Sequence, residues 1–416
     1  MKINLSKSRL IGIIILIILI ASIFIFPMDR NGLLLINSVV IIATLINTRV
    51  SIISLWSIIS NYVMLNVYFY DVTGLAYGIL GVSTVDFVTM LRYMLIWNIS
   101  LFVWGSVTDF VQRERHILTY DGYAPGKNFS MICCGIAILS IIIAFPTMPF
   151  SFGNRFKALL PGNAWNHFAI IALLFVLTRV REYKFVAATY IFVIGWFLSH
   201  YERVDVLGLF IAILTVSIAK NIGKKENLIQ IIKIAIICLI VFFVMSFLGE
   251  ARAQSSFNIS DMVKKFLKQN TASDVAYMYN IAIDYIKHND LLLGKSFLRY
   301  FIEIIPVFDG SRLETTNILS GVYHSVPGGS FVLNEPLMNF GLWGVIIIPN
   351  IYIFLMYNLI KKVNVYRYIV YLFLLTTVFR YLWYGMGYIE TGMIWIIPIL
   401  YAMYKKITGK RRNVEI

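Results

Sequence analysis

Long apolar runs recur along almost the whole of this 416-residue chain. Many are near 20 residues long, the length that an α-helix needs to cross about 30 Å of hydrocarbon. The composition agrees with such spans, because 59% of the residues are hydrophobic and only 14% are charged. We therefore expect an all-α integral membrane protein with many spans, to which the usual estimate of domain number from chain length does not apply.

We predict about twelve transmembrane helices and one large external loop. The helices run near 9–26, 32–47, 51–70, 87–108, 129–148, 164–178, 185–200, 204–220, 228–248, 337–360, 366–385 and 390–407. The chain is thus organised as nine helices in 1–248, an external loop in 249–336, and three helices with a basic tail in 337–416. The even number of spans places both termini on the same side of the membrane.

The formal net charge of +15 reflects membrane topology rather than nucleic-acid binding. Lys and Arg gather in alternate short connections, as the positive-inside rule expects for the cytoplasmic side. These connections contain Arg49, Arg113, Arg115, Arg179, Arg181, Lys184, Lys220, Lys224, Lys225, Lys361, Lys362 and Arg367. Together with the basic residues after Lys405, they predict cytoplasmic termini. The first apolar run is expected to stay attached, because no small-residue cleavage site follows it.

The external loop has a pattern of its own. Apolar residues from Val275 to Ile286 have helical spacing, and we expect an amphipathic helix that lies along the bilayer or the protein surface and ends at Asn289. A second apolar run, 297–307, is too short to span and contains Pro306. It is expected to be a re-entrant or interfacial piece.

The loop returns to the membrane through the segment 321–344, which contains candidate binding residues. Gly328 and Gly329 would let backbone N–H groups approach a phosphate or a sugar, and His324 or Glu335 would handle a proton. Pro336 suits the first turn of the next helix, whose N-terminal end favours an ionised Glu335. The alternative is an ordinary surface loop.

Three arginines are candidates for holding an anionic lipid-linked substrate. Arg203 lies in a tight external hairpin, and Arg252 follows the ninth span. A guanidinium there would grip phosphate oxygens with two hydrogen bonds. Arg380 lies within an apolar run, where an ionisable residue suggests a function, and Glu390 is a candidate partner. The alternatives are that Arg203 pairs with a neighbouring carboxylate and that Arg380 snorkels to the interface.

The sequence disfavours several other functions because it lacks their motifs. The chain has no phosphate-binding P-loop, no HExxH, no CxxC pair and no Asp-rich nucleotide-sugar domain. Its three cysteines, Cys133, Cys134 and Cys238, lie in apolar segments and suggest neither disulfides nor a metal site.

Two short stretches resemble the O-antigen and oligosaccharide repeat unit polymerases of the Wzy type. The first comprises Gly328, Gly329, Ser330, Phe331, Glu335 and the run Asn339, Phe340, Gly341, Leu342, Trp343, Gly344. It is similar to the segment with which these enzymes re-enter the membrane after their periplasmic loop. The second, 202–207, is similar to their Arg-containing step before an apolar helix, with Glu202 in the place of the family's usual Gly or Ser. The layout of about twelve spans with one late loop also agrees.

This resemblance implies a fold like that of GT-C-type lipid-linked glycan polymerases and ligases, in the bacterial inner membrane. It implies transfer of a growing glycan from undecaprenyl diphosphate to an incoming lipid-linked repeat unit, during synthesis of O-antigen in lipopolysaccharide or of a related surface polysaccharide. Arg203, Arg252 and Arg380 would stabilise the leaving diphosphate, and His324 or Glu335 would act on the acceptor hydroxyl. Gly328, Gly329 and Gly341 would shape the loop.

The resemblance implies no metal and no cofactor. The expected partners are the lipid-linked oligosaccharide, membrane lipids and a chain-length regulator and flippase of the same pathway, but no nucleic acid. A glycan ligase and a flippase or transporter remain alternatives. Deletion would leave single-repeat surface glycan for a polymerase, undecorated acceptor with accumulated polymer for a ligase, and cytoplasmic lipid-linked repeats for a flippase.

Overall fold

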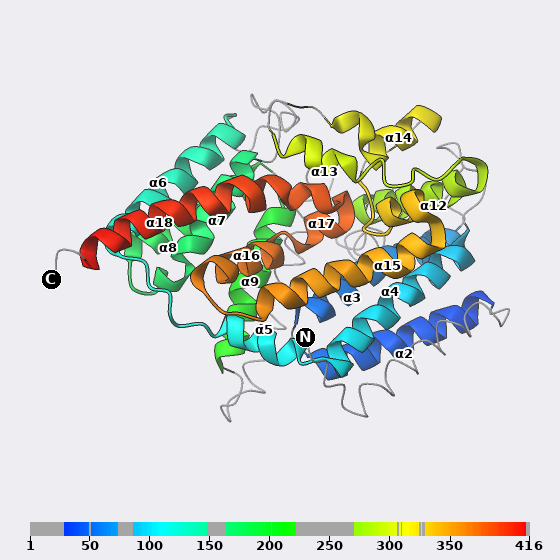
Figure 1. Ribbon diagram of the computed structural model, residues 1–416, viewed down its shortest axis with the longest axis horizontal. Coiled ribbons are helices and arrows are strands. Elements are labelled where there is room, and N and C mark those ends of the chain that lie inside the picture. The colour runs from blue at the N-terminus through cyan, green and yellow to red at the C-terminus, as the bar shows by residue number, and fades with distance from the viewer. Residues whose placement is uncertain are drawn as a thin grey trace. The chain divides into compact units, whose positions relative to one another are not determined.

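The structure is a computed structural model that describes residues 29–49, 51–73, 86–147, 164–200, 202–221, 270–305, 308, 310–323, 326 and 329–412. These residues form helices and no β-strand, with one isolated bridge between Ser330 and Tyr384 (Figure 1). The chain divides into two compact units that interleave along the sequence. The first unit comprises 1–114, 265–361 and 381–387, and the second comprises 115–264, 362–380 and 388–416.

The first unit is built around a buried helix from the segment predicted to form the external loop. Its main helices are α2 (Arg30–Thr48), α3 (Ile52–Thr73), α4 (Phe87–Val107), α12 (Asn270–His288) and α15 (Asn334–Ile360), with the shorter α13 (Leu298–Glu303), η3 (Ser311–Leu313) and α14 (Thr315–Val322). Helix α12 contacts α3, α4 and α15. Helix α5 (Phe110–Leu118) leads from this unit into the second.

Helix α12 differs from the expected surface helix. Ala276, Tyr277, Met278, Ile281 and Ile283 are each at most 1% exposed, although they point in different directions around the helix. The apolar spacing indicated the helix correctly, and Asn289 follows its last residue. The expectation that one face would lie on a surface is wrong, because neighbouring helices cover α12 on several sides.

Polar side chains join the apolar helices of the first unit. Asn98 of α4 donates to Asn37 of α2 at 2.8 Å and to Asn61 of α3 at 3.1 Å. Asn61 donates back to Asn98 at 2.8 Å. Amide pairs of this kind satisfy one another where water is excluded, so this triad fixes how α2, α3 and α4 meet.

The second unit contains the helices that surround Arg380. They are α6 (Lys127–Ala144), α7 (Ala164–Val176), η2 (Leu177–Arg179), α8 (Lys184–Ser199), α9 (Val204–Asn221), α16 (Val365–Thr376), the π-helical η5 (Gly392–Ile396) and α18 (Ile397–Arg412). Helix α16 contacts α7, α9 and α18, and α6 contacts α7 and α8. Helix α17 (Val378–Tyr384) is shared by the two units: its residues up to Arg380 belong to the second unit, and those from Tyr381 belong to the first. The following η4 (Met386–Ile389) leads back into the second unit.

Five described helices are long and apolar enough to cross a membrane: α2, α4, α6, α15 and the stretch Met386–Thr408. A sixth span is formed if α16 and α17 are counted together, with a bend of 61° between them. Four shorter apolar helices cover parts of the predicted spans 51–70, 164–178, 185–200 and 204–220. The predicted spans 9–26 and 228–248 lie outside the described residues. The chain is therefore a helical membrane protein by its described part.

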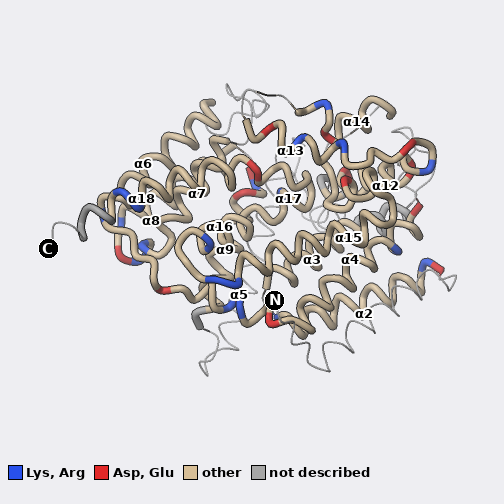
Figure 2. Tube along the Cα trace, in the orientation of Figure 1, with Lys and Arg blue, Asp and Glu red and all other residues tan. Residues whose placement is uncertain are grey.

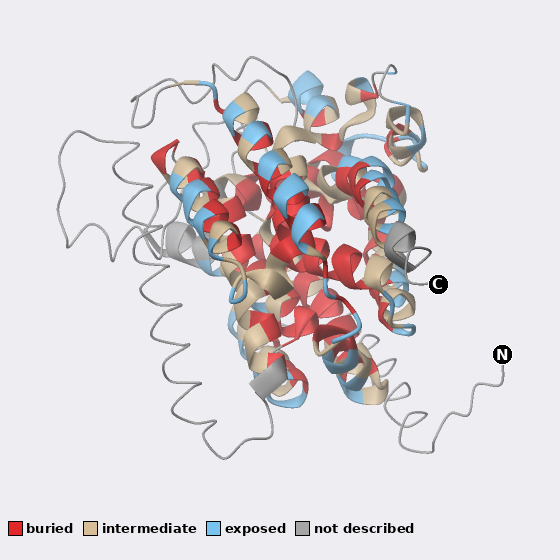
Figure 3. Cartoon of the chain, turned by 90° about the vertical axis from the view of Figure 1, so that its left-hand side faces the viewer, coloured by how far each residue is buried: buried red, intermediate tan, exposed pale blue. Residues whose placement is uncertain are grey.

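The surface of the helices suits lipid. Lys, Arg, Asp and Glu gather at helix ends and in connections, while α2, α4 and α15 are largely without charge along their length (Figure 2). Several helices have buried residues on one side and exposed residues on the other (Figure 3). Large apolar side chains are among the exposed ones, including Leu35, Ile46 and Leu139. Such a surface is expected against hydrocarbon rather than against water.

Candidate functional site

A buried carboxyl group lies at the start of α15, where the segment 289–333 leads into this helix. Glu335 is 7% exposed. Ser296 donates to its Oε1 at 2.8 Å, and the Tyr300 hydroxyl donates to its Oε2. Asn339, one turn further along α15, donates to Ser296 Oγ at 2.6 Å and to the Glu335 carbonyl oxygen at 2.7 Å. We call Glu335, Ser296, Tyr300, Asn339 and the adjacent Arg299 the Glu335 cluster.

Arg299 supplies the positive charge of the Glu335 cluster. Its guanidinium pairs with Glu314 at 3.3 Å and with Glu303 at 3.5 Å, and it lies over the Tyr300 ring. Burial alone would lower the pKa of Arg299, but Tyr300 and the charges of Glu314, Glu335 and Glu303 raise it above its ordinary value. The guanidinium therefore stays charged in a mostly buried place.

The local sequence explains how the cluster forms. Glu335 lies in the first turn of α15, where the unpaired N–H groups of the helix favour a carboxylate. Asn339 also accepts from the Gly294 N–H at 2.9 Å, which ties the loop after α12 to α15. Gly341 then breaks the helical backbone with φ 58° and ψ −138°. Residues with a side chain rarely adopt that conformation, so glycine is needed there.

Gly329 also has a backbone role in the first unit. Its φ is +87°, and an added Cβ would lie 3.0 Å from the Trp383 carbonyl oxygen. The next residue, Ser330, donates its N–H to that same oxygen at 2.9 Å, and Val332 donates to Leu382 at 2.9 Å. The glycine therefore lets this segment lie against 382–383. His324 and Gly328 lie outside the described residues.

Arg380 is held by two carboxylates in the second unit. Its Nε and Nη2 donate to the two oxygens of Asp205 at 3.1 and 2.8 Å, and Nη2 donates to Glu202 at 2.7 Å. The guanidinium lies over the ring of Tyr388, whose hydroxyl donates to Asp205 at 3.3 Å. Arg380, Glu202 and Asp205 are all less than 9% exposed. We call these four residues, with His167, the Arg380 cluster.

A close helix crossing holds the Arg380 cluster together. Asp205 lies in the first turn of α9, and Gly208 is one turn further along the same helix. An added Cβ on Gly208 would lie 1.7 Å from the carbonyl oxygen of Thr376, which is one turn before Arg380. Only glycine permits that approach of α9 to the end of α16. The crossing therefore brings Asp205 to Arg380.

His167 of α7 completes the cluster. It is fully buried, and its ring packs edge-on against Tyr388 at 4.8 Å and Phe373 at 5.2 Å between centroids. Neither ring nitrogen has a hydrogen-bond partner among the described residues. A buried imidazole without partners is costly and uncommon, so it invites a functional explanation.

The structure describes some of the arginines predicted from sequence and not others. Arg203 lies between Glu202 and Asp205 along the chain and is half-buried, whereas Arg252 lies outside the described residues. Sequence reasoning did not single out Arg299 or His167 as site residues. The signal for both was a basic residue inside an apolar run, the same signal that drew attention to Arg380.

Within the described part of the chain, no group of three or more His, Cys, Asp or Glu side chains is arranged to hold a metal ion. What the two clusters offer is ionisable groups in places of low exposure: a carboxyl group with hydroxyl donors beside Arg299, and a guanidinium between two carboxylates. Such groups suit proton transfer and the binding of polar or anionic ligands.

Comparison of the chain with protein-family models finds no match, and comparisons with curated proteins and with solved structures find none either.

Proposed function

We propose that this protein is a polymerase of undecaprenyl-diphosphate-linked oligosaccharide repeat units. The observation that carries the proposal is the Glu335 cluster. It places a buried carboxylate, two hydroxyl donors and an arginine where the polar segment rejoins an apolar helix. Two of its five residues, Glu335 and Asn339, belong to the stretch that resembles the repeat unit polymerases.

The proposed reaction is a glycosyl transfer without a nucleotide sugar. The oxygen of a sugar hydroxyl on the incoming repeat unit bonds to the anomeric carbon of the growing glycan, and the bond from that carbon to the diphosphate breaks. The hydroxyl proton passes to a base, for which Glu335 and His324 are the candidates. The electron pair leaves with the undecaprenyl diphosphate, whose charge Arg203 and Arg252 stabilise.

The neighbours of Arg380 favour a positioning role for it over direct contact with the diphosphate. Two carboxylates face one guanidinium, so Arg380, Glu202 and Asp205 together have a formal charge of −1. A diphosphate would have to compete with both carboxylates for Arg380. We therefore assign Arg380 to positioning the hairpin around Arg203, and the diphosphate contact to Arg203 itself.

The first test is the surface glycan of a deletion strain that is complemented with variants. Wild type should restore long chains, and Arg203→Ala should leave mostly single repeats while inserting normally. Lys184→Ala, which removes a charge from another connection of the second unit, is the matched control and should restore long chains. Long chains with Arg203→Ala would overturn the assigned role.

The second test addresses Glu335 with purified protein in proteoliposomes that contain lipid-linked repeat units. Glu335→Gln keeps the shape of the side chain but removes its basicity, so release of undecaprenyl diphosphate should fall by about 100-fold or more if Glu335 is the base. Asp290→Asn, at an exposed position of the same external segment, should have no effect. An unchanged rate for Glu335→Gln would limit Glu335 to a structural part, and absence of polymer from the wild type would refute the proposed function.

A further inference from the structure

The second unit also contains a cavity of about 590 Å³. Helices α8 and α9, η2 and Tyr368 of α16 line it. This size is ordinary for sites that bind small molecules or single lipid chains. None of the residues of the Arg380 cluster lines it, so it is separate from the site described above.

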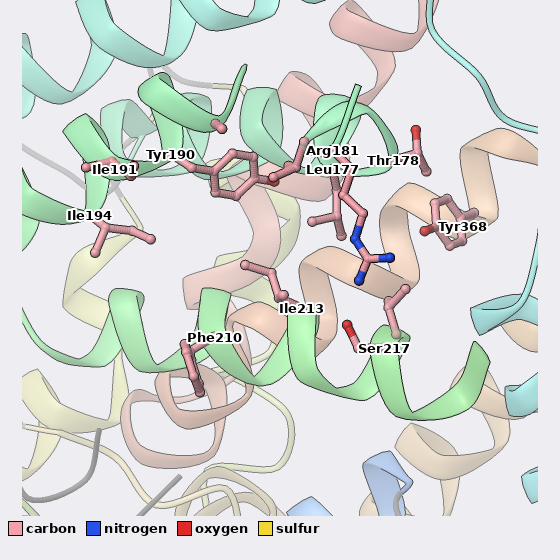
Figure 4. A pocket seen from close by; sticks show the side chains of 13 residues that line it. Leu177, Thr178, Arg181, Tyr190, Ile191, Ile194, Phe210, Ile213, Ser217 and Tyr368 are labelled. Atoms are coloured by element: carbon pink, nitrogen blue, oxygen red, sulfur yellow. The ribbon is translucent and has the colours of Figure 1, made fainter. Parts of the chain in front are cut away.

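The cavity is apolar at one end and polar at the other. Ile191, Ile194 and Phe210 line the apolar end, whereas the Arg181 guanidinium extends into the space between Tyr368 and Ser217 (Figure 4). Ile191 is also 73% exposed, so the apolar end adjoins surface that lipid chains can reach. The cavity therefore suits an amphiphilic molecule.

Two groups at the polar end have no partner among the described residues. Tyr368 is fully buried, and its hydroxyl makes no hydrogen bond there. Arg181 is exposed and makes no ion pair or hydrogen bond within the described part, in contrast to its neighbour Arg179, which donates to the Pro125 carbonyl oxygen and pairs with Glu182. Buried hydroxyl groups are normally satisfied, so Tyr368 indicates that a further acceptor belongs in the cavity.

The charge of the polar end selects the kind of head group. Among the described residues that line the cavity, Arg181 is the only cationic side chain, so it matches a phosphodiester with a single negative charge better than a diphosphate. Under the positive-inside rule the connection of Arg181 faces the cytoplasm, and the cytoplasmic leaflet is rich in anionic lipids.

We propose that this cavity binds one anionic glycerophospholipid. Its phosphodiester accepts hydrogen bonds from Arg181 and Tyr368, and one acyl chain lies between α8 and α9. Because the site is separate from both clusters, the proposal does not depend on the reaction that the protein catalyses.

The test measures lipid binding by native mass spectrometry of the full-length protein in detergent. Dioleoyl phosphatidylglycerol should bind at least tenfold more tightly than dioleoyl phosphatidylcholine. Arg181→Gln should weaken phosphatidylglycerol binding about tenfold, in line with the loss of a charged hydrogen bond. Lys184→Gln removes the same charge three residues further along, at the start of α8, but Lys184 does not line the cavity, so this variant should leave the affinity unchanged.

Further binding measurements distinguish the proposed lipid from other possible occupants of the cavity. Ala187→Phe places a ring within the cavity and should weaken binding while Arg181 is intact, which also tests the site if Arg181→Gln fails to fold. Glycerol 3-phosphate, which lacks the chains, should not compete. Equal losses in Arg181→Gln and Lys184→Gln, equal binding of both lipids, competition by glycerol 3-phosphate, or tighter binding of undecaprenyl phosphate would each overturn the proposal.

Discussion

At the residue scale, the second unit contains buried ion pairs between Arg380 and two carboxylates. Removing one partner of a buried ion pair is costly, because the other charge stays buried without compensation. Arg380→Gln should therefore destabilise the protein by about 3–5 kcal/mol, since it removes the positive charge that Glu202 and Asp205 share. This loss would be visible as a lower thermal unfolding midpoint in detergent.

A double substitution distinguishes this electrostatic cost from general loss of packing. Asp205→Asn alone also breaks the pair, but the two changes together remove opposite charges. The double variant should thus be more stable than the sum of the single effects by about 1–3 kcal/mol. Strictly additive effects would show that the contact between the two side chains contributes little.

Asp274 of α12 gives the first unit a dependence on pH. Burial raises its pKa from 3.8 to about 6. Between these values the folded state binds more protons than the unfolded state, so the free energy of unfolding falls as the pH rises from about 4 to about 6 and then levels off. Asp274→Asn resembles the neutral acid and should raise the unfolding midpoint at pH 7.5 but not at pH 4. An equal shift at both pH values would contradict the assignment.

At the scale of elements, the crossing of α9 and α16 depends on one glycine. Because an added Cβ on Gly208 would lie 1.7 Å from a backbone oxygen, the helices must separate to accept it. Gly208→Ala should therefore destabilise the second unit by at least about 2 kcal/mol, a typical cost of overpacking. Gly195→Ala in α8 is the matched control, because its Cβ would meet no atom within 4 Å. If both variants unfold at the same temperature, the crossing is not close in the folded protein.

The helices were predictable from sequence because hydropathy and length depend on consecutive residues. The predicted span 87–108 corresponds to Phe87–Val107, and 337–360 corresponds to Asn334–Ile360, within a few residues at each end. The bend between α16 and α17 was not predicted, since neither Pro nor Gly marks Thr377. The burial of α12 was missed for a related reason: the pattern of a helix shows which faces are apolar, but not which neighbours cover its other faces.

The candidate site was predictable only where a residue type conflicts with its surroundings. Arg380 in an apolar run and Glu335 before Pro336 stood out along the chain. Their partners did not, because Asp205 is 175 residues from Arg380 and Ser296 is 39 residues from Glu335. Such pairs are made by the packing of helices, which no local pattern contains.

At the scale of the whole molecule, the positive-inside rule predicts opposite membrane sides for two exposed positions. Glu182 lies in a basic connection expected to face the cytoplasm, and Asp290 follows α12 in the external segment. With the native cysteines replaced by alanine, Asp290→Cys should react with a membrane-impermeant maleimide in intact spheroplasts. Glu182→Cys should react only after the membrane is permeabilised.

The labelling experiment includes a control for access of the maleimide to buried cysteines. Cys133 and Cys134 are buried in α6, so a variant that retains these two alone should resist the reagent until the protein is unfolded. Labelling of Glu182→Cys in intact spheroplasts, with Asp290→Cys protected until permeabilisation, would reverse the orientation. The Glu335 cluster would then face the cytoplasm together with the external segment, and an external polymerase reaction at this cluster would be ruled out, whereas the lipid cavity would remain but would face the outer leaflet.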